Sequence, residues 1–214
     1  INNIIVNDCN LGIGTFCAPD TCYPEMTNCL IFMENSVSQA IQIFDGGNPL
    51  ITGNIIIGGE YCNYGINVAY NVKTIIIKNN VVSGFIFNNI SPSDVTESAL
   101  IENNNSLHLP ENIFGWAGIE GDPNTVIRNN ITAYSNVGIR GWSTPVTNNN
   151  LFWQNINNTI GGVSLDSSDI VADPMFVNDT IPVYGGTYDY HLQKYSPAID
   201  AGDPNILDVD GSRS

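Results

Sequence analysis

Basic residues are scarce in this chain. It has 6 Lys and Arg against 21 Asp and Glu, which gives a formal net charge of −15 at pH 7. Proteins that bind nucleic acid or anionic membranes depend on clustered Lys and Arg, so we expect neither partner. Only 13% of the residues are charged, so Asn, Ser, Thr and Gly must cover most of the surface. Such a surface is typical of an extracellular or cell-surface protein that handles neutral or hydrated polymers.

Long apolar runs and helical periodicity are also missing. No run approaches the roughly 18 apolar residues of a membrane-spanning helix, so we expect no membrane insertion. No stretch of about 11 residues has its apolar residues at helical spacing, which argues against an α-helical fold. The chain begins at Ile1 with no basic-then-apolar leader, so we expect a mature protein or a fragment of a longer one.

Familiar metal-binding and catalytic motifs are absent. There are two His residues and no CxxC pair, so zinc is the weaker explanation for the cysteines. No GxSxG elbow, P-loop or HExxH motif occurs. Of the five cysteines, four crowd into an aperiodic N-terminal stretch: Cys9, Cys17, Cys22 and Cys29. We expect them to form a disulfide staple in an oxidising compartment, with three pairings open. Cys62 is either an odd thiol or a partner for one of the four.

The chain does have a repeat, in which an apolar residue, a variable residue and an Asn pair recur. The copies end at Asn35, Asn54, Asn80, Asn104, Asn130 and Asn149. Their steps of about 19 to 26 residues lie in the range of solenoid repeats. A second short β-type run follows each copy, for example QAIQIF or VGIRGW. This pattern predicts a β-solenoid. A β-propeller, which needs about 40 or more residues per blade, is the alternative fold.

Over roughly residues 27–178 this pattern resembles the right-handed parallel β-helix family, the pectate-lyase-like architecture of many secreted polysaccharide lyases, pectinase-like hydrolases and bacterial surface proteins. The resemblance implies an all-β solenoid of about six to eight coils, with inward Asn residues stacked from coil to coil. An Asn amide both donates and accepts, so stacked Asn side chains can hydrogen-bond along the axis. We expect the ladder to consist of Asn79, Asn103, Asn129 and Asn148.

The C-terminal runs DIVADPMFVN, DYHLQKYSPAIDAGDPN and DVDGSRS resemble the closing segment of bacterial secreted β-helix proteins of polysaccharide-related or unknown function. We expect one continuous domain that consists of a disulfide-stapled N-terminal segment (1–26), coils (27–178) and a closing segment (179–214). In the family this run usually continues with a further strand, so an open last coil could associate end to end with another chain. The closing segment also has oxygen ligands for Ca²⁺, with loop hydrogen bonding as the alternative role: Asp203, Asn205, Asp208 and Asp210.

Two columns of side chains are expected to face outward, because side chains alternate along a strand. The first column contains Thr52, Lys78, Glu102, Arg128 and Thr147. Its charged members are either a Lys or Arg base, as β-helix lyases use, or a surface ion-pair stack worth at most about 1 kcal/mol per pair. The second column contains Gln42, Asn67, Glu120, Arg140 and Ser164, with Ile86 interrupting it.

Acidic, basic and aromatic residues gather around the second column. Asp122 and Trp142 lie two residues beyond it and Trp116 lies four residues before Glu120. Aromatic faces stack on sugar rings and charged groups hydrogen-bond hydroxyls or uronate carboxylates. We therefore expect a carbohydrate groove at Trp116, Trp142 and Asn67, with Glu120, Asp122 and Arg140 as candidate catalytic residues. Ordinary solenoid surface is the alternative.

The sequence thus predicts a secreted or cell-surface β-helix protein that contacts polysaccharide. A polysaccharide lyase or hydrolase is one form of this hypothesis. The sequence has neither the Trp-x-Asp-His and Arg-x-Pro-x-x-Arg runs that resemble pectate lyases nor the Asn-Thr-Asp, Asp-Asp and Arg-x-Lys signatures of polygalacturonase-type hydrolases. A non-catalytic structural, adhesin or assembly module is the alternative.

Overall fold

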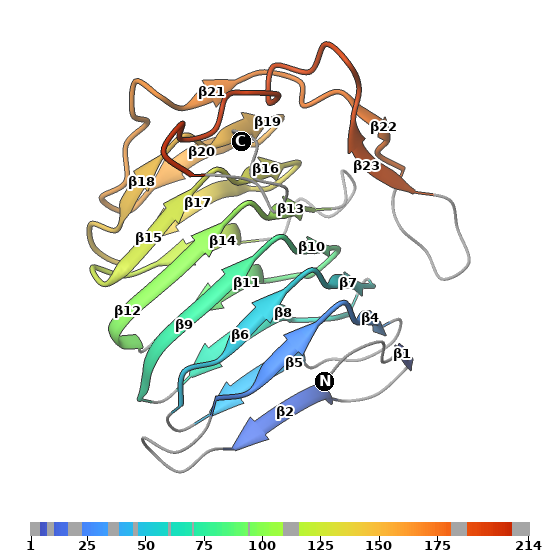
Figure 1. Ribbon diagram of the computed structural model, residues 1–214, viewed down its shortest axis with the longest axis vertical. Helices are drawn as coiled ribbons and strands as arrows, with labels where there is room; N and C mark the ends of the chain where they lie inside the picture. The colour runs from blue at the N-terminus through green and yellow to red at the C-terminus, as the bar shows by residue number, and fades with distance from the viewer. Residues whose placement is uncertain are drawn as a thin grey trace.

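The computed structural model describes residues 5–7, 11–16, 23–33, 39–44, 47–59, 61–69, 71–93, 95–108, 116–180 and 188–206. Throughout these residues the secondary structure is β only, and three parallel sheets stack into a β-solenoid (Figure 1). The all-β solenoid predicted from the repeat is confirmed. Among the described residues no helix is long and apolar enough to cross a membrane.

The chain visits the three sheets in turn. The six-stranded sheet contains, in spatial order, β3 (Glu25–Thr27), β6 (Leu50–Thr52), β9 (Val72–Lys78), β12 (Val95–Glu102), β15 (Thr125–Arg128) and β18 (Val146–Asn148). The eight-stranded sheet contains β1 (Ile5–Asn7), β4 (Leu30–Met33), β7 (Ile55–Gly58), β10 (Val81–Ser83), β13 (Asn105–Leu107), β16 (Ile131–Ala133), β19 (Leu151–Trp153) and β21 (Ile170–Val171). The seven-stranded sheet contains β2 (Leu11–Phe16), β5 (Gln39–Phe44), β8 (Tyr64–Ala69), β11 (Asn88–Pro92), β14 (Ala117–Gly121), β17 (Val137–Gly141) and β20 (Asn157–Ile160).

Four turns of the solenoid, β6–β8, β9–β11, β12–β14 and β15–β17, have all three strands paired on both sides. The fully paired solenoid is thus about four turns long, fewer than the six to eight coils predicted. The turns outside these four lack a neighbouring strand in at least one sheet among the described residues. The eight-stranded and seven-stranded sheets begin with β1 and β2, which lie within the expected N-terminal segment, residues 1–26.

Aliphatic columns fill the inside of the solenoid. In the six-stranded sheet the inward column is Ile51, Ile77, Ile101 and Ile127. In the seven-stranded sheet it is Ile41, Ile66, Ile90, Ile119 and Ile139. All of these side chains are fully buried and belong to one core cluster. β-branched side chains suit this stacking because they are stiff and pack well on a pleated surface.

The Asn pairs form the corner between the six-stranded and the eight-stranded sheet. The first residue of each corner has a positive φ of 52° to 68°: Asn28, Gly53, Asn79, Asn103, Asn129 and Asn149. The second residue points inward and is buried: Asn54, Asn80, Asn104, Asn130 and Asn150. The predicted ladder of Asn79, Asn103, Asn129 and Asn148 is therefore wrong. The left-handed residue makes the turn with its side chain outside the core, so the residue after it enters the interior; Asn148 instead ends β18.

The buried Asn residues form a continuous hydrogen-bonded ladder. At a typical step, the backbone N–H and Nδ2 of Asn80 both donate to Oδ1 of Asn104 at 3.0 Å. The same pair of bonds joins Asn54 to Asn80 and Asn104 to Asn130 at 2.9–3.0 Å, and Asn130 to Asn150 at 3.0–3.1 Å. Each Nδ2 also donates to a backbone carbonyl, as Asn104 does to Ile77 at 2.9 Å. The ladder thus satisfies buried backbone groups at every corner.

The C-terminal part of the chain closes the solenoid over the outside of the eight-stranded sheet. β22 (Phe176–Asn178) and β23 (Asp189–Leu192) form an antiparallel pair, seen beside the C-terminal coils in Figure 1. Phe176 packs in a second apolar cluster with Leu107, Ile131 and Leu151. The Tyr134 hydroxyl donates to Asp179 at 2.6 Å.

The cysteines lie mostly outside the described residues, which exclude Cys9, Cys17 and Cys22. Cys29 is buried, and its backbone N–H starts the ladder by donating to Oδ1 of Asn54 at 2.9 Å. Cys62 is also buried, with Sγ 2.7 Å from the carbonyl of Met33. The disulfide staple stays a prediction.

Candidate functional site

One outward column on the seven-stranded sheet brings the predicted site residues together. The strand register aligns Gly14, Gln42, Asn67, Ser91, Glu120, Arg140 and Ile160. The predicted column was right at Gln42, Asn67, Glu120 and Arg140. It was wrong at Ile86 and Ser164, because the strand of the third coil is β11 (Asn88–Pro92), which follows Ile86, and Ser164 lies beyond β20.

Arg140 lies between two tryptophan rings. Its guanidinium carbon is 4.0 Å from the ring centroid of Trp142 and 5.0 Å from that of Trp116. A cation within about 6 Å of a ring centroid is attracted by the negative face of the ring. The rings themselves are largely open to solvent, with Trp116 51% and Trp142 63% exposed. The stack therefore holds Arg140 in place and presents aromatic surface to the outside.

Glu120 is the buried acid of this cluster. Its Oε1 lies 3.7 Å from Nη1 of Arg140, and its side chain is 8% exposed. Its Oε2 accepts a 2.8 Å hydrogen bond from the Ser91 hydroxyl. Burial, and then the charge of Glu120, raise the pKa of the nearby Tyr64 phenol. The carboxylate thus has a cationic and a hydroxyl partner from the strands on either side of β14.

A groove of about 920 Å³ opens beside Glu120. Its lining combines apolar surface with neutral polar and acidic side chains and comes from several successive coils: Tyr64, Asn67, Asn71, Ser91, Pro92, Ser93, Val95, Thr96, Glu120, Gly121, Asp122 and Trp142. Four of the six predicted groove and catalytic residues line it. The other two, Trp116 and Arg140, adjoin it through the ring stack.

Asp122 lines the groove but is held by its own turn. Its Oδ1 accepts hydrogen bonds from the backbone N–H of Asn124 and from the Thr125 hydroxyl, both at 2.9 Å. This arrangement is an Asx turn. One carboxylate oxygen of Asp122 is therefore engaged in shaping the loop after β14, which leaves the other to face a ligand.

Sequence reasoning missed the aromatic row that continues the stack toward the N-terminus. The rings of Phe87 and Trp116 are edge-on with centroids 6.1 Å apart, and those of Tyr64 and Phe87 are 5.5 Å apart. Asn67, in the same coil as Tyr64, donates to Oε1 of Gln39 at 2.8 Å. Tyr64 starts β8 directly before a glycine, a position with no strong signal of its own in the repeat.

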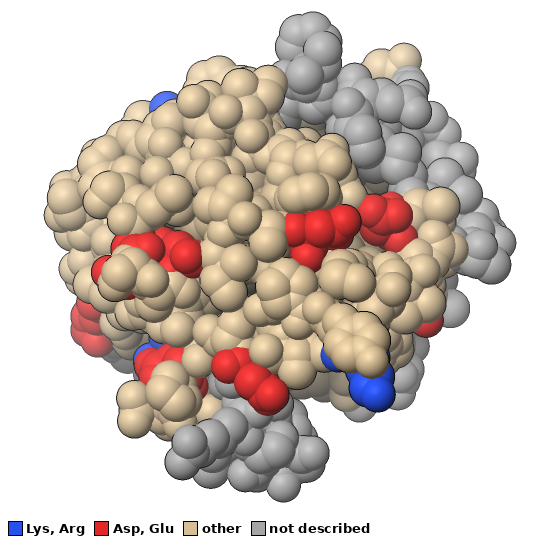
Figure 2. All heavy atoms as spheres, turned by 90° about the horizontal axis from the view of Figure 1, so that it is seen from above, with Lys and Arg blue, Asp and Glu red and all other residues tan. Residues whose placement is uncertain are grey.

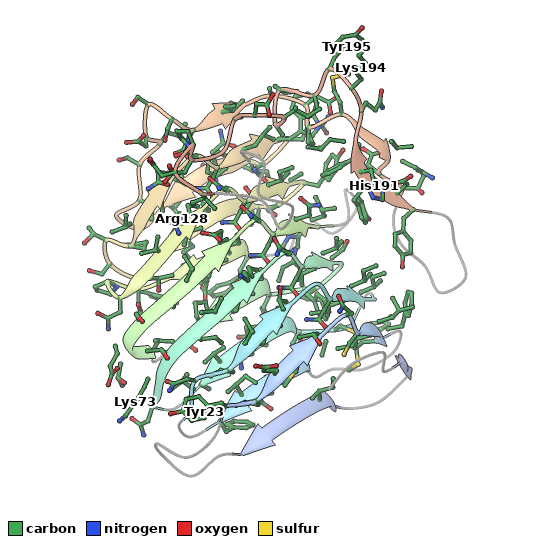
Figure 3. All side chains as sticks on the ribbon, in the orientation of Figure 1. Tyr23, Lys73, Arg128, His191, Lys194 and Tyr195 are labelled. Atoms are coloured by element: carbon green, nitrogen blue, oxygen red, sulfur yellow. The ribbon has the colours of Figure 1, made fainter. Side chains whose placement is uncertain are left out.

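The other predicted charge column lies on a different sheet. The register confirms Thr52, Lys78, Glu102 and Arg128 in one column of the six-stranded sheet, followed by Asn148 where Thr147 was expected. Nε and Nη2 of Arg128 both lie 2.7 Å from Oε2 of Glu102. Figure 3 shows Arg128 beside β15, on the six-stranded sheet. This pair does not line the groove.

The expected calcium ligands form an ordinary turn where the structure describes them. The backbone N–H and Nδ2 of Asn205 both donate to Oδ1 of Asp203 at 2.9 Å, which lowers the pKa of that carboxyl. Asp208 and Asp210 lie outside the described residues. Within the described residues no three His, Cys, Asp or Glu side chains gather as a metal site would need.

The chain matches no protein-family model, no curated protein and no solved structure. The groove thus brings aromatic faces, neutral polar groups and two carboxylates together from several coils.

Proposed function

We propose that the protein binds a polysaccharide chain in the groove of the seven-stranded sheet. The observation that carries this proposal is the stack in which Arg140 is fixed between Trp116 and Trp142 at the edge of the groove. Each tryptophan keeps about half or more of its surface exposed. Rigid, exposed aromatic faces are suited to stack against sugar rings, because they contribute large apolar area at little entropic cost.

The polar lining supports the same proposal. Amide and hydroxyl groups of Asn67, Ser93 and Thr96 line the groove from neighbouring coils. Ligand sites combine apolar surface with a small number of placed polar groups that fix orientation. The residues of one outward column recur at about 4.8 Å, so a chain along the solenoid axis would meet similar groups at each coil.

The proposal includes a cellular location and a family relationship. The acidic, Asn-rich composition and the resemblance of the repeat and closing segment to secreted β-helix proteins, the polysaccharide lyases among them, favour an extracellular or cell-surface role. Membership of the pectate-lyase-like family is part of this proposal.

Catalysis at the same groove is the second form of the proposal, because two carboxylates line it. Glu120 and Asp122 are two residues apart on one strand end, and glycoside hydrolysis uses a pair of carboxylates roughly 5–9.5 Å apart. Glu120 is the candidate to substitute first, because it lies beside Arg140 at the tryptophan stack. Product analysis by mass spectrometry would show shortened glycans with the native protein and none with Glu120→Gln.

Binding is tested by titrating the protein against a glycan array and then by calorimetry on the best ligand. Trp142→Ala should weaken binding at least about tenfold, which is 1.4 kcal/mol. The matched control is Tyr195→Ala, since Tyr195 is 79% exposed and lies in the C-terminal segment, away from the seven-stranded sheet (Figure 3). Equal affinities of the two variants, or no binding to any glycan, would refute the proposal.

A structural or assembly role remains the alternative, in which the last coils associate end to end with another chain. β18 and β20 each have a neighbour on one side only in the described part of the chain. Light scattering over a broad concentration range distinguishes the two proposals: a concentration-dependent rise in mass with no glycan binding would favour assembly.

A further inference from the structure

The charged side chains that line the groove are both acidic. Glu120 and Asp122 are the charged side chains among its lining residues, which all belong to the described part of the chain. The whole chain has a formal net charge of −15. Figure 2 shows this imbalance on the C-terminal end of the molecule, where Asp and Glu atoms outnumber those of Lys and Arg. An anionic ligand would approach the groove against this field.

Arg140, the cation next to the groove, already has its partners. It faces Glu120 at 3.7 Å, it is covered by two tryptophan rings, and its side chain is 19% exposed. A ligand carboxylate that binds Arg140 must either displace Glu120 or share the guanidinium with it. That would leave a carboxylate with 8% exposure beside a second negative charge. Breaking a buried pair in this way is strongly unfavourable.

The other described cations lie elsewhere. Lys78 and Arg128 belong to the outward column of the six-stranded sheet. Lys73 lies two residues beyond the groove residue Asn71 but does not line the groove. Lys194 lies in the C-terminal segment, next to Tyr195 (Figure 3). None of these four cations lines the groove.

Three hydroxyl groups that line the groove already donate their hydrogens within the protein. The hydroxyl of Ser93 donates to the carbonyl of Val68 at 2.8 Å, and that of Thr96 donates to the carbonyl of Val72 at 3.3 Å. The Ser91 hydroxyl donates to Glu120. Once a hydroxyl hydrogen is used, the oxygen still accepts. These oxygens and the two carboxylates can therefore accept hydrogen bonds from a ligand that donates them.

We propose that this groove selects a carboxylate-free glycan, bound along the solenoid axis, whose hydroxyl or amino groups donate to the row of acceptors, and that it rejects uronate chains. The inference rests on the proposed polysaccharide function and names the substrate class. Uronate carboxylates only accept hydrogen bonds, so they are mismatched to both the charge and the acceptors of the groove. From β8 to β17 the chain would cross three coil steps, about 14 Å.

The test compares hexasaccharides of matched length by calorimetry at low and moderate salt. Cellohexaose, mannohexaose and laminarihexaose are the neutral probes, the chitosan hexamer is the amino probe, and hexagalacturonate and hexamannuronate are the uronate probes. We expect at least one carboxylate-free hexamer to bind tenfold or more tighter than either uronate. Tighter binding of a uronate would overturn this inference and leave the proposed function intact. Binding of none of the six would overturn this inference, and binding of no glycan on the array would overturn the proposed function as well.

Variants of the two acids sharpen the test. Glu120→Gln removes the competitor for Arg140, so uronate affinity should rise at least tenfold relative to the native protein. Asp122→Asn is the matched control, because it removes one negative charge at the same groove without releasing Arg140 and its amide oxygen can still accept the turn hydrogen bonds. It should raise uronate affinity less than threefold. Equal gains from the two variants would show that net charge alone, and not the engaged Arg140, excludes uronates. Thermal melts of both variants establish that they fold.

Discussion

Replacing one rung of the asparagine ladder should destabilise the whole solenoid. In Asn104→Ala, the backbone N–H of Asn80 loses its acceptor at 3.0 Å and the carbonyl of Ile77 loses its donor at 2.9 Å. Both groups are buried, and an unsatisfied buried group costs about 1–3 kcal/mol. The expected loss is about 4 kcal/mol in the free energy of unfolding, or roughly 8–16 °C in Tm for a chain of this length.

The neighbouring residue provides the control. Asn103 has a φ of 56° and its side chain lies outside the ladder. Asn103→Ala should cost only the strain of a left-handed alanine, about 1–2 kcal/mol, and Asn103→Gly should be close to neutral. Urea unfolding followed by tryptophan fluorescence and far-UV circular dichroism measures all three, with m compared as well because solenoids can unfold in stages. If Asn103→Ala destabilised the protein as much as Asn104→Ala, the assignment of turn and rung would be refuted.

Three further predictions concern titratable and tightly packed positions. Burial lowers the pKa of His108 to about 4, so between this value and the unfolded pKa of about 6.5 the unfolded state binds more protons than the folded state. The free energy of unfolding should therefore fall by about 3 kcal/mol as the pH is lowered from 6.5 to 4. In urea titrations His108→Gln should show a weaker dependence of stability on pH over this range. Burial and the hydrogen bond to Asp179 raise the pKa of Tyr134. The free energy of unfolding should therefore decline above about pH 10, where the tyrosine ionises in the unfolded state before it does so in the folded state. Tyr134→Phe should lose about 1 kcal/mol of stability at pH 7, and its Tm should fall less steeply than that of the native protein at alkaline pH. A Cβ at Gly65, in β8, would overlap Val82, so Gly65→Ala should lower the unfolding free energy by about 1–3 kcal/mol. An unchanged Tm would contradict this close packing around Gly65.

The sequence contained enough information to predict the solenoid and also to avoid the error in the ladder. Both members of an Asn pair can donate, accept and adopt positive φ, so the pair alone does not say which one turns and which one points inward. The coil containing Gly53 resolves the ambiguity, because glycine there precedes the single asparagine Asn54. Gly53 aligns with Asn79, and glycine favours a left-handed turn. The second position is then the rung.

The alignment of Glu120 and Arg140 in one column was predictable from the sequence, whereas the stacking of Arg140 with the tryptophan rings was not. Glu120 and Arg140 align because each follows a Gly-Ile pair in its coil, and the sheet register pairs them. Ser91 was missed because residues 84–87, which precede β11, have a strand-like apolar pattern but belong to no strand. The cover of Trp116 and Trp142 over Arg140 depends on side-chain rotamers, which the repeat does not encode.

The ladder and the groove lie on different sides of the solenoid, yet one depends on the other. Asn104, Asn130 and Asn150 fix each coil against the next at the corner of the six-stranded and eight-stranded sheets. A slip of one residue would turn every side chain of a strand to the opposite face, so Arg140 would point into the apolar core and away from Glu120. The uniform pairing at the ladder therefore maintains the one register in which acid, base and aromatic rings share a face. Each ladder asparagine affects the groove only by holding the strands in register. Replacing one of them should therefore weaken ligand binding only to the extent that it unfolds or shifts β14 and β17.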